Sequence, residues 1–283
     1  MEVQYPKISV ITPSFNQGQF LEETLLSVIN QNYQNLEYIV IDGGSTDGSV
    51  EIIEKYGHYL AYWVSENDSG QSEAINKGFK RATGEIVCWI NSDDILMPGS
   101  LNEVARYFEN HKNVDIVSGI LVNIDKNSII YSSFFTIKHK KWYAKHGVYY
   151  MNQPTLFWKR EIFDTTGLLR EDFHFRMDRE LLIRFFQNNF KFGFIRKILA
   201  GFRMHERSKS SEGESSKILK RDRSVIYELH GEKYGRKSPK MFYRLIYGME
   251  KLTKGIYFEK WAFERKWIGK KVDRLNPNNC NYM

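Results

Sequence analysis

The sequence contains only two cysteines among 283 residues and no long uninterrupted apolar segment. Cys88 lies inside the apolar run of residues 86–90, and Cys280 lies far from it, close to the C-terminus. This distribution argues against a disulfide framework. No stretch reaches the roughly 18 uncharged apolar residues that a membrane span needs. The first residues, MEVQYP, have neither the basic nor the apolar region of a secretory signal. These absences predict a cytoplasmic protein.

Two glycine motifs that bind phosphate groups are also missing. A G-x-G-x-x-G turn would follow the first strand of a dinucleotide-binding protein, but Gly18 stands alone there. The G-x-x-x-x-G-K-[ST] loop does not occur anywhere in the chain. Dinucleotide-dependent oxidoreductases and P-loop phosphotransferases are therefore excluded.

Positive charge is concentrated in the C-terminal part of the chain. Residues 236–274 contain twelve Lys or Arg and four Asp or Glu, a net charge of +8, so the rest of the chain contributes about −1 to the total of +7. Apolar and aromatic residues recur between these cations at spacings that suit amphipathic helices. A basic helical extension over residues 211–283 can lie on an anionic membrane, pack against the main domain or contact another subunit. The sequence leaves these alternatives open.

Apolar, β-rich runs alternate with helical patterns along the first 120 residues. The runs expected to form strands are Lys7–Pro13, Glu37–Asp42, Ala61–Ser65, Glu85–Ile90 and Val114–Ser118. Their nearly continuous apolar character is typical of parallel strands covered by helices on both faces. Beyond residue 120 the pattern is less regular, with a helix expected over Asp178–Asn188. The sequence therefore predicts an α/β domain over residues 1–210, divided near residue 120.

Polar residues follow the first four expected strands, over residues 12–18, 42–49, 66–70 and 91–94. Parallel strands end at one edge of a sheet, and ligands bind at that edge. Asp93 and Asp94 are adjacent carboxylates that repel each other, and either a hard divalent cation or a solvated turn would explain them. Asp42 is explained equally by ligand binding or by a glycine-rich turn, whereas Asp47 is expected to cap the next helix.

Five segments, in order, resemble the family 2 glycosyltransferases, which have the GT-A fold. They lie between Ile8 and about His205 and read ITPSFN (11–16), DGGSTDG (42–48), SENDSG (65–70), GE with NSDD (84–85 and 91–94) and MDRELLIR (177–184). The resemblance implies a mostly parallel, Rossmann-like sheet flanked by helices. Residues 1–120 would be the nucleotide-sugar-binding half and residues 121–210 the acceptor-side half, followed by the C-terminal helical extension.

The same resemblance implies a role for each matching residue. The residues expected to line the pocket for the base and the ribose are Pro13, Ser14, Phe15, Asn16 and Asp42. Asp68 would close the far wall of this pocket, and Asp93 would approach the ribose or the sugar. Asp94 would bind Mn²⁺ or Mg²⁺ between the two phosphates, where the ion offsets the charge that develops on the leaving diphosphate.

Three further candidate residues either lie where the sequence departs from the family pattern or have an alternative explanation. Asp178 is the candidate general base, although Met177 stands where relatives have an acidic residue. Lys77 is expected to contact a phosphate in place of an arginine that many relatives have at the position of Ile75. His205 is either a ligand of the metal or diphosphate, or a structural histidine with satisfied hydrogen bonds.

Other side chains near these candidates are expected to have supporting roles. Glu180 is expected to be structural, and Arg184, four residues later, either lies on the solvated face of the helix or pairs with Glu180. Residues 208–216 are rich in Ser and Glu and are expected to form a mobile loop. Arg203 and Lys209 would reach the phosphates as this segment closes over the donor.

The resemblance implies an inverting transfer of a sugar from a nucleoside-diphosphate sugar, with UDP-sugars favoured, to a hydroxyl of a glycan or a lipid-linked acceptor. Such a reaction serves the synthesis of cell-surface polysaccharide or glycolipid, at the inner face of the membrane. The alternative is a degenerate, noncatalytic module that binds a nucleotide, or a basic module for membranes or nucleic acid. No nucleic-acid partner is expected, because phosphate-binding surfaces avoid clustered carboxylates unless a metal lies among them.

Overall fold

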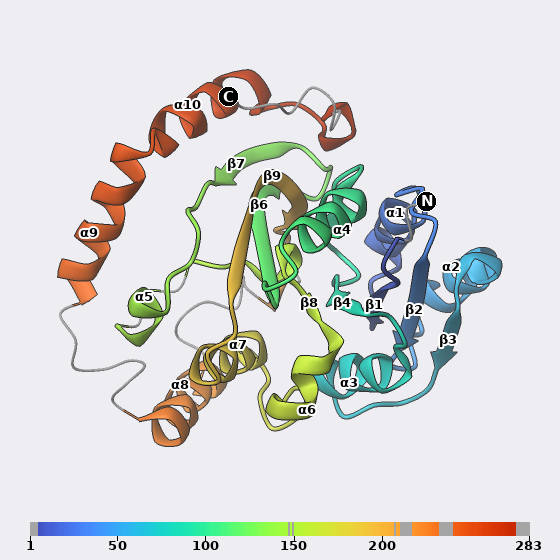
Figure 1. The fold of residues 1–283 in the computed structure, drawn as a ribbon. Coiled ribbons are helices and arrows are strands. Elements are labelled where there is room, and N and C mark those ends of the chain that lie inside the picture. The colour runs from blue at the N-terminus through green and yellow to red at the C-terminus, as the bar shows by residue number, and fades with distance from the viewer. Residues whose placement is uncertain are drawn as a thin grey trace.

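The computed structural model describes residues 5–275 apart from 147, 149, 207, 210–216 and 232–239. Its strands are β1 (Ile8–Ser14), β2 (Leu36–Asp42), β3 (Tyr62–Ser65), β4 (Ile86–Trp89), β5 (Ile95–Leu96), β6 (Ile116–Ile124), β7 (Ile130–Phe134), β8 (Phe157–Lys159) and β9 (Phe192–Arg203). Its helices are α1 (Gly18–Ile29), α2 (Ser49–Tyr56), α3 (Gln71–Arg81), α4 (Ser100–Asn110), α5 (Lys141–Lys145), α6 (Phe163–Thr166), α7 (Met177–Gln187), α8 (Lys217–His230), α9 (Lys240–Thr253) and α10 (Ile256–Trp267). One sheet of nine strands runs through the molecule with helices on both faces (Figure 1).

The first four strands form a parallel unit in the order β3-β2-β1-β4. Their observed ends agree with the predicted ones to within one residue. Along β1, Val10 packs with α1 on one face of the sheet and Ile11 packs with α3 on the other, which is the two-residue period of a strand. Helix α3 lies close to the sheet because Gly78 has no side chain, and a Cβ there would be 2.4 Å from Cγ2 of Ile11.

The fifth predicted strand is part of the longer β6 and does not lie next to β4. Strand β8 inserts between them and runs antiparallel to both, so that Trp158 pairs with Val87 on one side and with Ile116 on the other. β6 then pairs in parallel with β9, β7 pairs antiparallel with β6, and β5 pairs antiparallel with β9. The expected parallel arrangement thus holds for β1 to β4, whereas the whole sheet is mixed.

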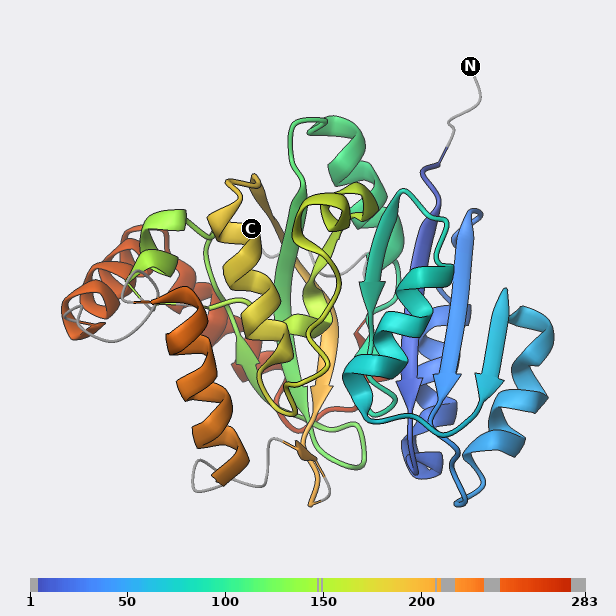
Figure 2. The same ribbon diagram turned by 90° about the horizontal axis from the view of Figure 1, so that it is seen from below.

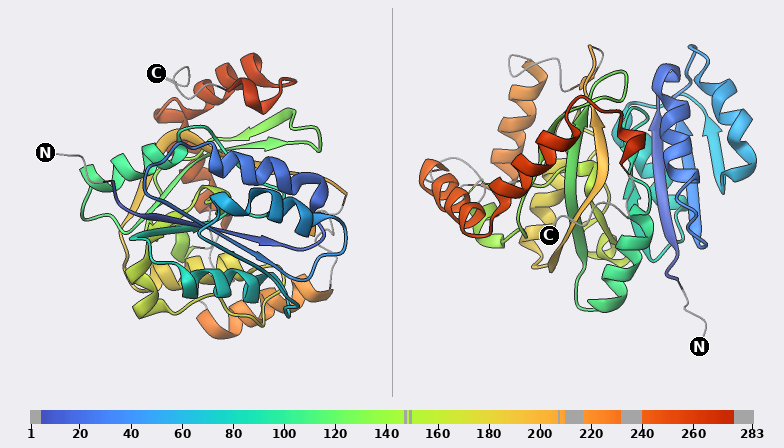
Figure 3. Two further views of the ribbon diagram at one scale, coloured as in Figure 1. Left: turned by 90° about the vertical axis from the view of Figure 1, so that its right-hand side faces the viewer. Right: turned by 90° about the horizontal axis from the view of Figure 1, so that it is seen from above.

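The C-terminal helices pack against the rest of the protein (Figures 2 and 3). Val225 and Ile226 of α8 join the apolar cluster that contains the inner face of α7. Tyr247, Phe263 and Trp267 of α9 and α10 are buried in a third cluster with residues of β6 and β7. Of the three alternatives for the extension, packing on the main domain is therefore observed, and the boundary at residue 210 stays a prediction. Across the described residues, none of the helices has the length and apolar character needed to cross a bilayer.

Candidate active site

Four strands, β1, β2, β4 and β9, end at one edge of the sheet, and expected site residues lie at or just after their ends (Figure 2). β1 ends at Ser14, which pairs with Asp42 at the end of β2. β4 is followed by residues 91–94. β9 reaches the same edge with Arg203, whose backbone N–H donates to Oδ1 of Asp94 over 2.9 Å. The fold therefore brings together segments that are far apart in the sequence.

Asp42 is fully buried and organises the loop after β2. Its Oδ2 accepts hydrogen bonds from the N–H groups of Gly44 and Ser45, at 3.1 and 2.8 Å, and from Oγ of Ser65 at 2.7 Å. Its Oδ1 accepts from Oγ of Ser45 at 2.6 Å. Three donors thus converge on Oδ2 and one on Oδ1, which keeps one acceptor position, but the side chain has no exposed surface. The turn explanation is thus observed, and the contact of Asp42 with a base stays a prediction without support from this geometry.

Asn16 ties the loop after β1 to the loop after β2. Its Oδ1 accepts from the N–H of Thr46 over 2.9 Å, and its own N–H donates to Oγ of Ser45 over 2.8 Å. Asn16 has φ of +50°, a left-handed conformation that asparagine adopts more readily than most residues. In the same region Oδ1 of Asp47 accepts from the N–H of Ser49 over 3.2 Å, but the N-cap residue of α2 is Gly48, so Asp47 lies one residue before the expected cap position.

Phe15 is the exposed residue of the segment expected to line the base pocket. Its neighbours Pro13 and Ser14 are buried at the end of β1, whereas Phe15 is 60% exposed at the strand edge. An aromatic ring at this place offers a flat apolar face to a planar base. The available signal was a bulky aromatic residue between a buried strand and a turn, a position at which packing does not require one.

Asp68 lies against the loop after β2. Its Oδ1 accepts from the N–H of Gly70 over 2.8 Å, and its Oδ2 occupies the space in which a side chain at position 43 would begin. A Cβ on Gly43 would lie 2.7 Å from that oxygen. Burial raises the pKa of Asp68 above its ordinary value. The absence of a side chain at Gly43 thus sets the position of a carboxyl group at the expected wall of the base pocket.

Lys77 forms ion pairs within its own surroundings. Its Nζ lies 2.9 Å from Oε1 of Glu66 and 3.0 Å from Oε1 of Glu73. The hydrogen bond to Glu66, more than any other cause, raises the pKa of Lys77. Two carboxylates already compensate this cation and use two of its three donors, so this geometry gives its predicted phosphate contact no support.

Asp94 is a buried structural residue in this geometry. It has no exposed surface, its Oδ1 accepts from the N–H of Arg203, and its Oδ2 accepts from Nδ2 of Asn91 over 3.1 Å. Burial, followed by the neighbouring carboxylate of Asp93, holds the pKa of Asp94 well above its ordinary value. Because the side chain has no exposed surface and both of its oxygens accept hydrogen bonds, this geometry does not support the expected metal contact from Asp94.

Asp93 is the member of the pair that faces a possible ligand. Its Oδ2 lies 3.1 Å from Nε2 of His205, and its side chain keeps 18% of its surface exposed. The imidazole ring of His205 packs against Phe20 with the ring centroids 4.5 Å apart. A carboxylate oxygen and an imidazole nitrogen therefore lie side by side at the strand-end edge.

Arg203 was expected to contact phosphates from a flexible segment, but it lies in a strand. It is the last residue of β9 and has no exposed surface. Its Nε donates to the backbone oxygen of Asp93 over 2.8 Å, its Nη2 to Glu23 over 2.7 Å and its Nη1 to Oγ of Ser128 over 2.9 Å. These bonds occupy the guanidinium group and fix the backbone of the loop that carries Asp93.

A hydrogen-bonded chain links the segment after β9 to α3. Nζ of Lys209 donates to Oε1 of Gln71 over 3.0 Å, and Nε2 of Gln71 donates to Oδ1 of Asn91 over 2.8 Å. Residues 203–209 therefore run along the strand-end edge, apart from residue 207, which is not described. The expected mobile loop over residues 208–216 lies outside the described residues except for Ser208 and Lys209.

Asp178 lies in the first turn of α7, next to the start of α3. Ser72 of α3 donates to Sδ of Met177 over 2.8 Å and to the backbone oxygen of Phe173 over 3.3 Å. Burial raises the pKa of Asp178, opposed by the N–H of Arg179 at the helix start and by the charge of the same residue. A raised pKa brings a carboxylate closer to the proton affinity that suits a general base at neutral pH.

Helix α8 supports the segment that leads into α7, a role that the sequence did not reveal. Asp222 is fully buried, and its Oδ2 accepts from the N–H groups of His174 and Phe175 at 3.2 and 2.9 Å. These two hydrogen-bond partners are backbone groups, which leave no trace in the sequence. Glu180 pairs with Arg184 at 2.7 Å, as predicted, and is joined by His230 of α8 at 3.1 Å.

Asp93 and His205 fit an ion that is held mainly by phosphates. Within the described residues, no group of three or more His, Cys, Asp or Glu is placed to hold a metal. A cation bound with a nucleotide needs only one or two protein carboxylates, because phosphate oxygens and waters complete its shell. Carboxylate suits both Mg²⁺ and Mn²⁺, the two ions expected from the sequence.

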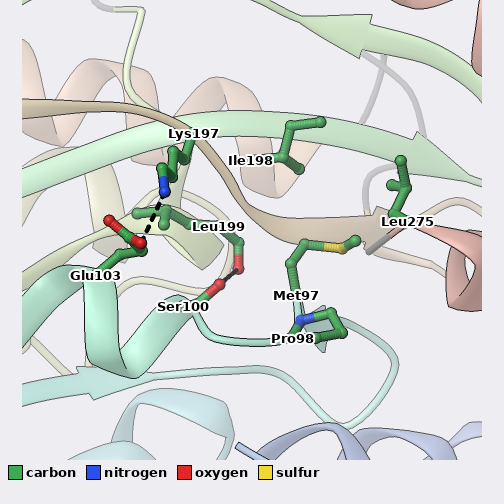
Figure 4. A pocket seen from close by; sticks show the side chains of 8 residues that line it. All are labelled: Met97, Pro98, Ser100, Glu103, Lys197, Ile198, Leu199 and Leu275. Atoms are coloured by element: carbon green, nitrogen blue, oxygen red, sulfur yellow. Dashed lines mark hydrogen bonds and ion pairs between the residues drawn. The ribbon is translucent and has the colours of Figure 1, made fainter. Parts of the chain in front are cut away.

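A small pocket lies elsewhere, between α4, β9 and the C-terminal segment (Figure 4). Within it Glu103 pairs with Lys197 at 2.7 Å, and Oγ of Ser100 donates to the backbone oxygen of Leu199 over 2.8 Å. The remaining lining is largely apolar and includes none of the predicted site residues. The strand-end edge, which holds the convergent polar side chains, is therefore the better candidate site.

Known proteins resemble this chain in sequence. A model of the family described as Glycosyl transferase family 2 matches residues 9–174. Glycosyltransferase GlyG of Streptococcus pneumoniae serotype 4 is 33% identical over 123 residues, which are 42% of this chain and 40% of that protein. An uncharacterised glycosyltransferase of Rickettsia typhi is 27% identical over 212 residues, 71% of this chain and 65% of the relative. This chain thus matches less than two thirds of either relative.

Two solved structures share the fold. The S. aureus TarS fragment 1–349 in complex with UDP-GlcNAc superposes with a TM-score of 0.65 at 21% identity, covering 92% of this chain and 76% of the fragment. Mannosyltransferase PcManGT from Pyrobaculum calidifontis, in complex with GDP-Man and Mn²⁺, gives 0.60 at 19% identity over 88% of this chain and 70% of its own. These similarities confirm the GT-A fold. Because the family model covers more than half of the sequence, the chain belongs to glycosyl transferase family 2.

Proposed function

We propose that this protein is an inverting glycosyltransferase that moves a sugar from a nucleoside-diphosphate sugar, with UDP-sugars favoured, to an acceptor hydroxyl. The observation that carries the proposal is the pair of Asp93 Oδ2 and His205 Nε2, 3.1 Å apart at the strand-end edge. Support for the donor class comes from the TarS complex with UDP-GlcNAc and the PcManGT complex with GDP-Man. Catalysis would thus take place where β1, β2, β4 and β9 end.

The donor would lie along this edge with its base at the loops after β1 and β3. The exposed ring of Phe15 would stack on the base, and Asp68 would contact its polar rim. The diphosphate would lie at Asp93 and His205. This arrangement gives Asp42 and Asp94 the structural task of shaping the loops, because their oxygens already accept hydrogen bonds within the protein.

The reaction would be a single displacement at the anomeric carbon. Mn²⁺ held by Asp93 and His205 would offset the charge that develops on the departing diphosphate. Asp178 would take the proton of the acceptor hydroxyl as its oxygen attacks, and burial raises its pKa toward the range in which a base is effective. One displacement inverts the anomeric configuration, by analogy with sugar hydrolysis.

The acceptor would be a glycan or a lipid-linked glycan in the synthesis of cell-surface polysaccharide or glycolipid, at the inner face of a membrane. The relative TarS of Staphylococcus aureus is a poly(ribitol-phosphate) β-N-acetylglucosaminyltransferase, which supports a polymer acceptor. The basic and aromatic character of α9 and α10 supports the membrane location.

The proposal is tested by the thermal stabilisation of the purified protein with UDP and with GDP, each with Mn²⁺ or EDTA. A ligand that binds only the folded state raises Tm. We expect a rise with one nucleotide that EDTA and the Asp93→Ala substitution abolish, whereas Asp164→Ala, which removes an exposed carboxylate of α6, leaves it unchanged. No rise with either nucleotide, or a rise that EDTA does not affect, would show that the edge is not a metal-dependent donor site.

A further inference from the structure

Helices α9 and α10 are apolar on two faces, and only one of them is covered. Tyr247, Phe263 and Trp267 are buried against β6 and β7. On the outward side Phe242, Leu245, Met249, Leu252, Phe258 and Trp261 are each more than half exposed. Both helices lie along the outer side of the molecule (Figure 1). A run of large exposed apolar side chains on this scale generally marks an interaction surface.

The charge on these helices is not balanced at the surface. Residues 240–271 contain nine Lys or Arg and three acidic residues, a net charge of +6. Each acidic residue is bound within the protein. Glu250 accepts from Oη of Tyr143 over 2.5 Å, Glu259 pairs with Arg196, and Glu264 accepts from a backbone N–H of β7 over 3.0 Å. The outward surface is therefore apolar and basic, with its carboxylates turned to internal partners.

We propose that this outward surface of α9 and α10 docks on an anionic lipid bilayer, with both helices lying in the plane of the membrane interface. Exposed apolar side chains would enter the boundary between headgroups and acyl chains, and the surrounding cations would contact lipid phosphates. Aromatic and basic groups are interleaved as this requires. The guanidinium of Arg265 lies 5.5 Å from the ring centroid of Trp261, and Trp is enriched at membrane interfaces.

A second copy of the chain is the rival occupant of this surface, and the charge argues against it. A two-fold symmetric dimer places the same patch on both partners, so the excess cations of one copy would face those of the other. Juxtaposed like charges across an interface are unfavourable. An anionic bilayer instead offers the complementary charge together with an apolar layer. Membrane docking rests on the proposed function only for the location of the protein at a membrane. It requires neither a bound sugar donor nor catalysis.

The test measures cosedimentation of the full-length protein with vesicles of phosphatidylcholine alone or mixed with phosphatidylglycerol. We expect binding to the mixed vesicles, weakened by salt. The double substitution Arg265→Glu/Lys266→Glu should lower the binding constant about tenfold or more, since each cation near an anionic surface contributes to binding. Lys217→Glu/Lys220→Glu makes the same charge change at exposed positions of α8 and should retain binding. Leu245→Gln/Met249→Gln should weaken it without a charge change.

Several outcomes would overturn membrane docking by this surface. One is an equal loss of vesicle binding in Lys217→Glu/Lys220→Glu and in Arg265→Glu/Lys266→Glu. Another is that the wild-type protein does not bind the mixed vesicles. A wild-type protein that forms dimers without vesicles, and loses them in Leu245→Gln/Met249→Gln, would instead assign the surface to a second copy. All substituted side chains are exposed, and unchanged Tm values would show that folding is intact. Nucleotide-induced stabilisation is measured separately, so a failure of docking is distinct from a failure of the proposed function.

Discussion

The guanidinium Nε of Arg203 donates to the backbone oxygen of Asp93 over 2.8 Å, although the two residues are 110 positions apart. The same side chain is fully buried and pairs with Glu23 of α1 at 2.7 Å. A cation at the end of β9 therefore holds the loop after β4 in place. The position of the proposed metal ligand depends on this long-range contact.

Replacing Arg203 should weaken both folding and nucleotide binding. Arg203→Met removes a hydrogen-bonded cation and leaves backbone acceptors unpaired, which should lower the free energy of unfolding by about 3 kcal/mol. Arg106→Met breaks an exposed pair with Glu103 and should cost less than about 1 kcal/mol. Urea unfolding of both variants makes the comparison, and similar losses would contradict a special role for Arg203.

Asp93 and Asp94 should differ in the function that each substitution removes. Asp93→Asn should abolish the Mn²⁺-dependent stabilisation by nucleotide and leave Tm without ligand nearly unchanged. Asp94→Ala removes the acceptor of the Arg203 N–H and should lower the free energy of unfolding by about 1–3 kcal/mol. Thermal unfolding with and without nucleotide separates the two effects. Retained metal dependence in Asp93→Asn together with its loss in Asp94→Asn would restore the assignment expected from the sequence.

Asp178→Asn should slow sugar transfer about 10²–10⁴-fold, the contribution of a general base, while nucleotide binding persists. Wild-type activity should fall as the pH decreases through the raised pKa of Asp178, because the protonated carboxyl cannot accept a proton. Transfer rates measured against pH check both statements. A variant with undiminished transfer would exclude Asp178 as the base.

Asp178→Asn, which should lower the activity, should raise the stability of the protein. Because the pKa of Asp178 is raised on folding, the native state binds its proton more tightly than the unfolded chain, and the carboxylate opposes folding above its ordinary pKa of about 4. Asp178→Asn should therefore be more stable than wild type near neutral pH, with a gain that disappears in acid. Asp164→Asn, at an exposed position, should show no such pH dependence.

Asp222 should be a positioning residue that acts through the backbone before α7. Asp222→Ala leaves the buried N–H groups of His174 and Phe175 without their acceptor, which should cost about 2 kcal/mol or more. Hydrogen exchange at these two amides should accelerate, and kcat should fall more than KM changes. Asp172→Ala, which breaks an exposed pair with Arg170, serves as the control. Unchanged exchange in Asp222→Ala would contradict this role.

Two helical glycines should respond to alanine with opposite signs. Gly78→Ala places a methyl group 2.4 Å from Ile11 and should destabilise the protein by about 1–3 kcal/mol. Gly248→Ala, in α9, meets its nearest atom, Oη of Tyr257, at 3.4 Å and should stabilise by about 0.5–1 kcal/mol through helix propensity. Chemical denaturation measures both, and a stabilising Gly78→Ala would contradict the close approach of α3 to β1.

The first four strands were predictable because each is a local apolar run that a helix covers on either side. The place of β6 in the sheet was not predictable. It depends on β8, three residues long, which inserts beside β4 through the pairing of Trp158 with Val87. Such a short segment carries no periodic signal of its own, and its partners are far away in the chain. The order of the second half of the sheet therefore follows from long-range packing.

The composition of the candidate site was predictable, whereas the roles within it were not. Asp93 and Asp94 are identical in type and adjacent, and only the approach of β9 decides which one is buried. Lys77 has a suitable charge, yet Glu66 and Glu73 already bind it. A motif fixes which residue types gather at an edge, and tertiary contacts decide which of their atoms stay available.

The support that α8 gives to the segment before α7 has a consequence for the synthesis of this protein. Ribosomes deliver a chain from its N-terminus, and every family motif lies before residue 206. The carboxylate of Asp222, which holds His174 and Phe175, arrives only after these motifs are complete. A nascent chain that stops at residue 210 would contain all the family motifs. It would lack the carboxylate of Asp222, which positions the segment before the proposed base Asp178. The segment before α7 therefore gains this support only once α8 has been synthesised.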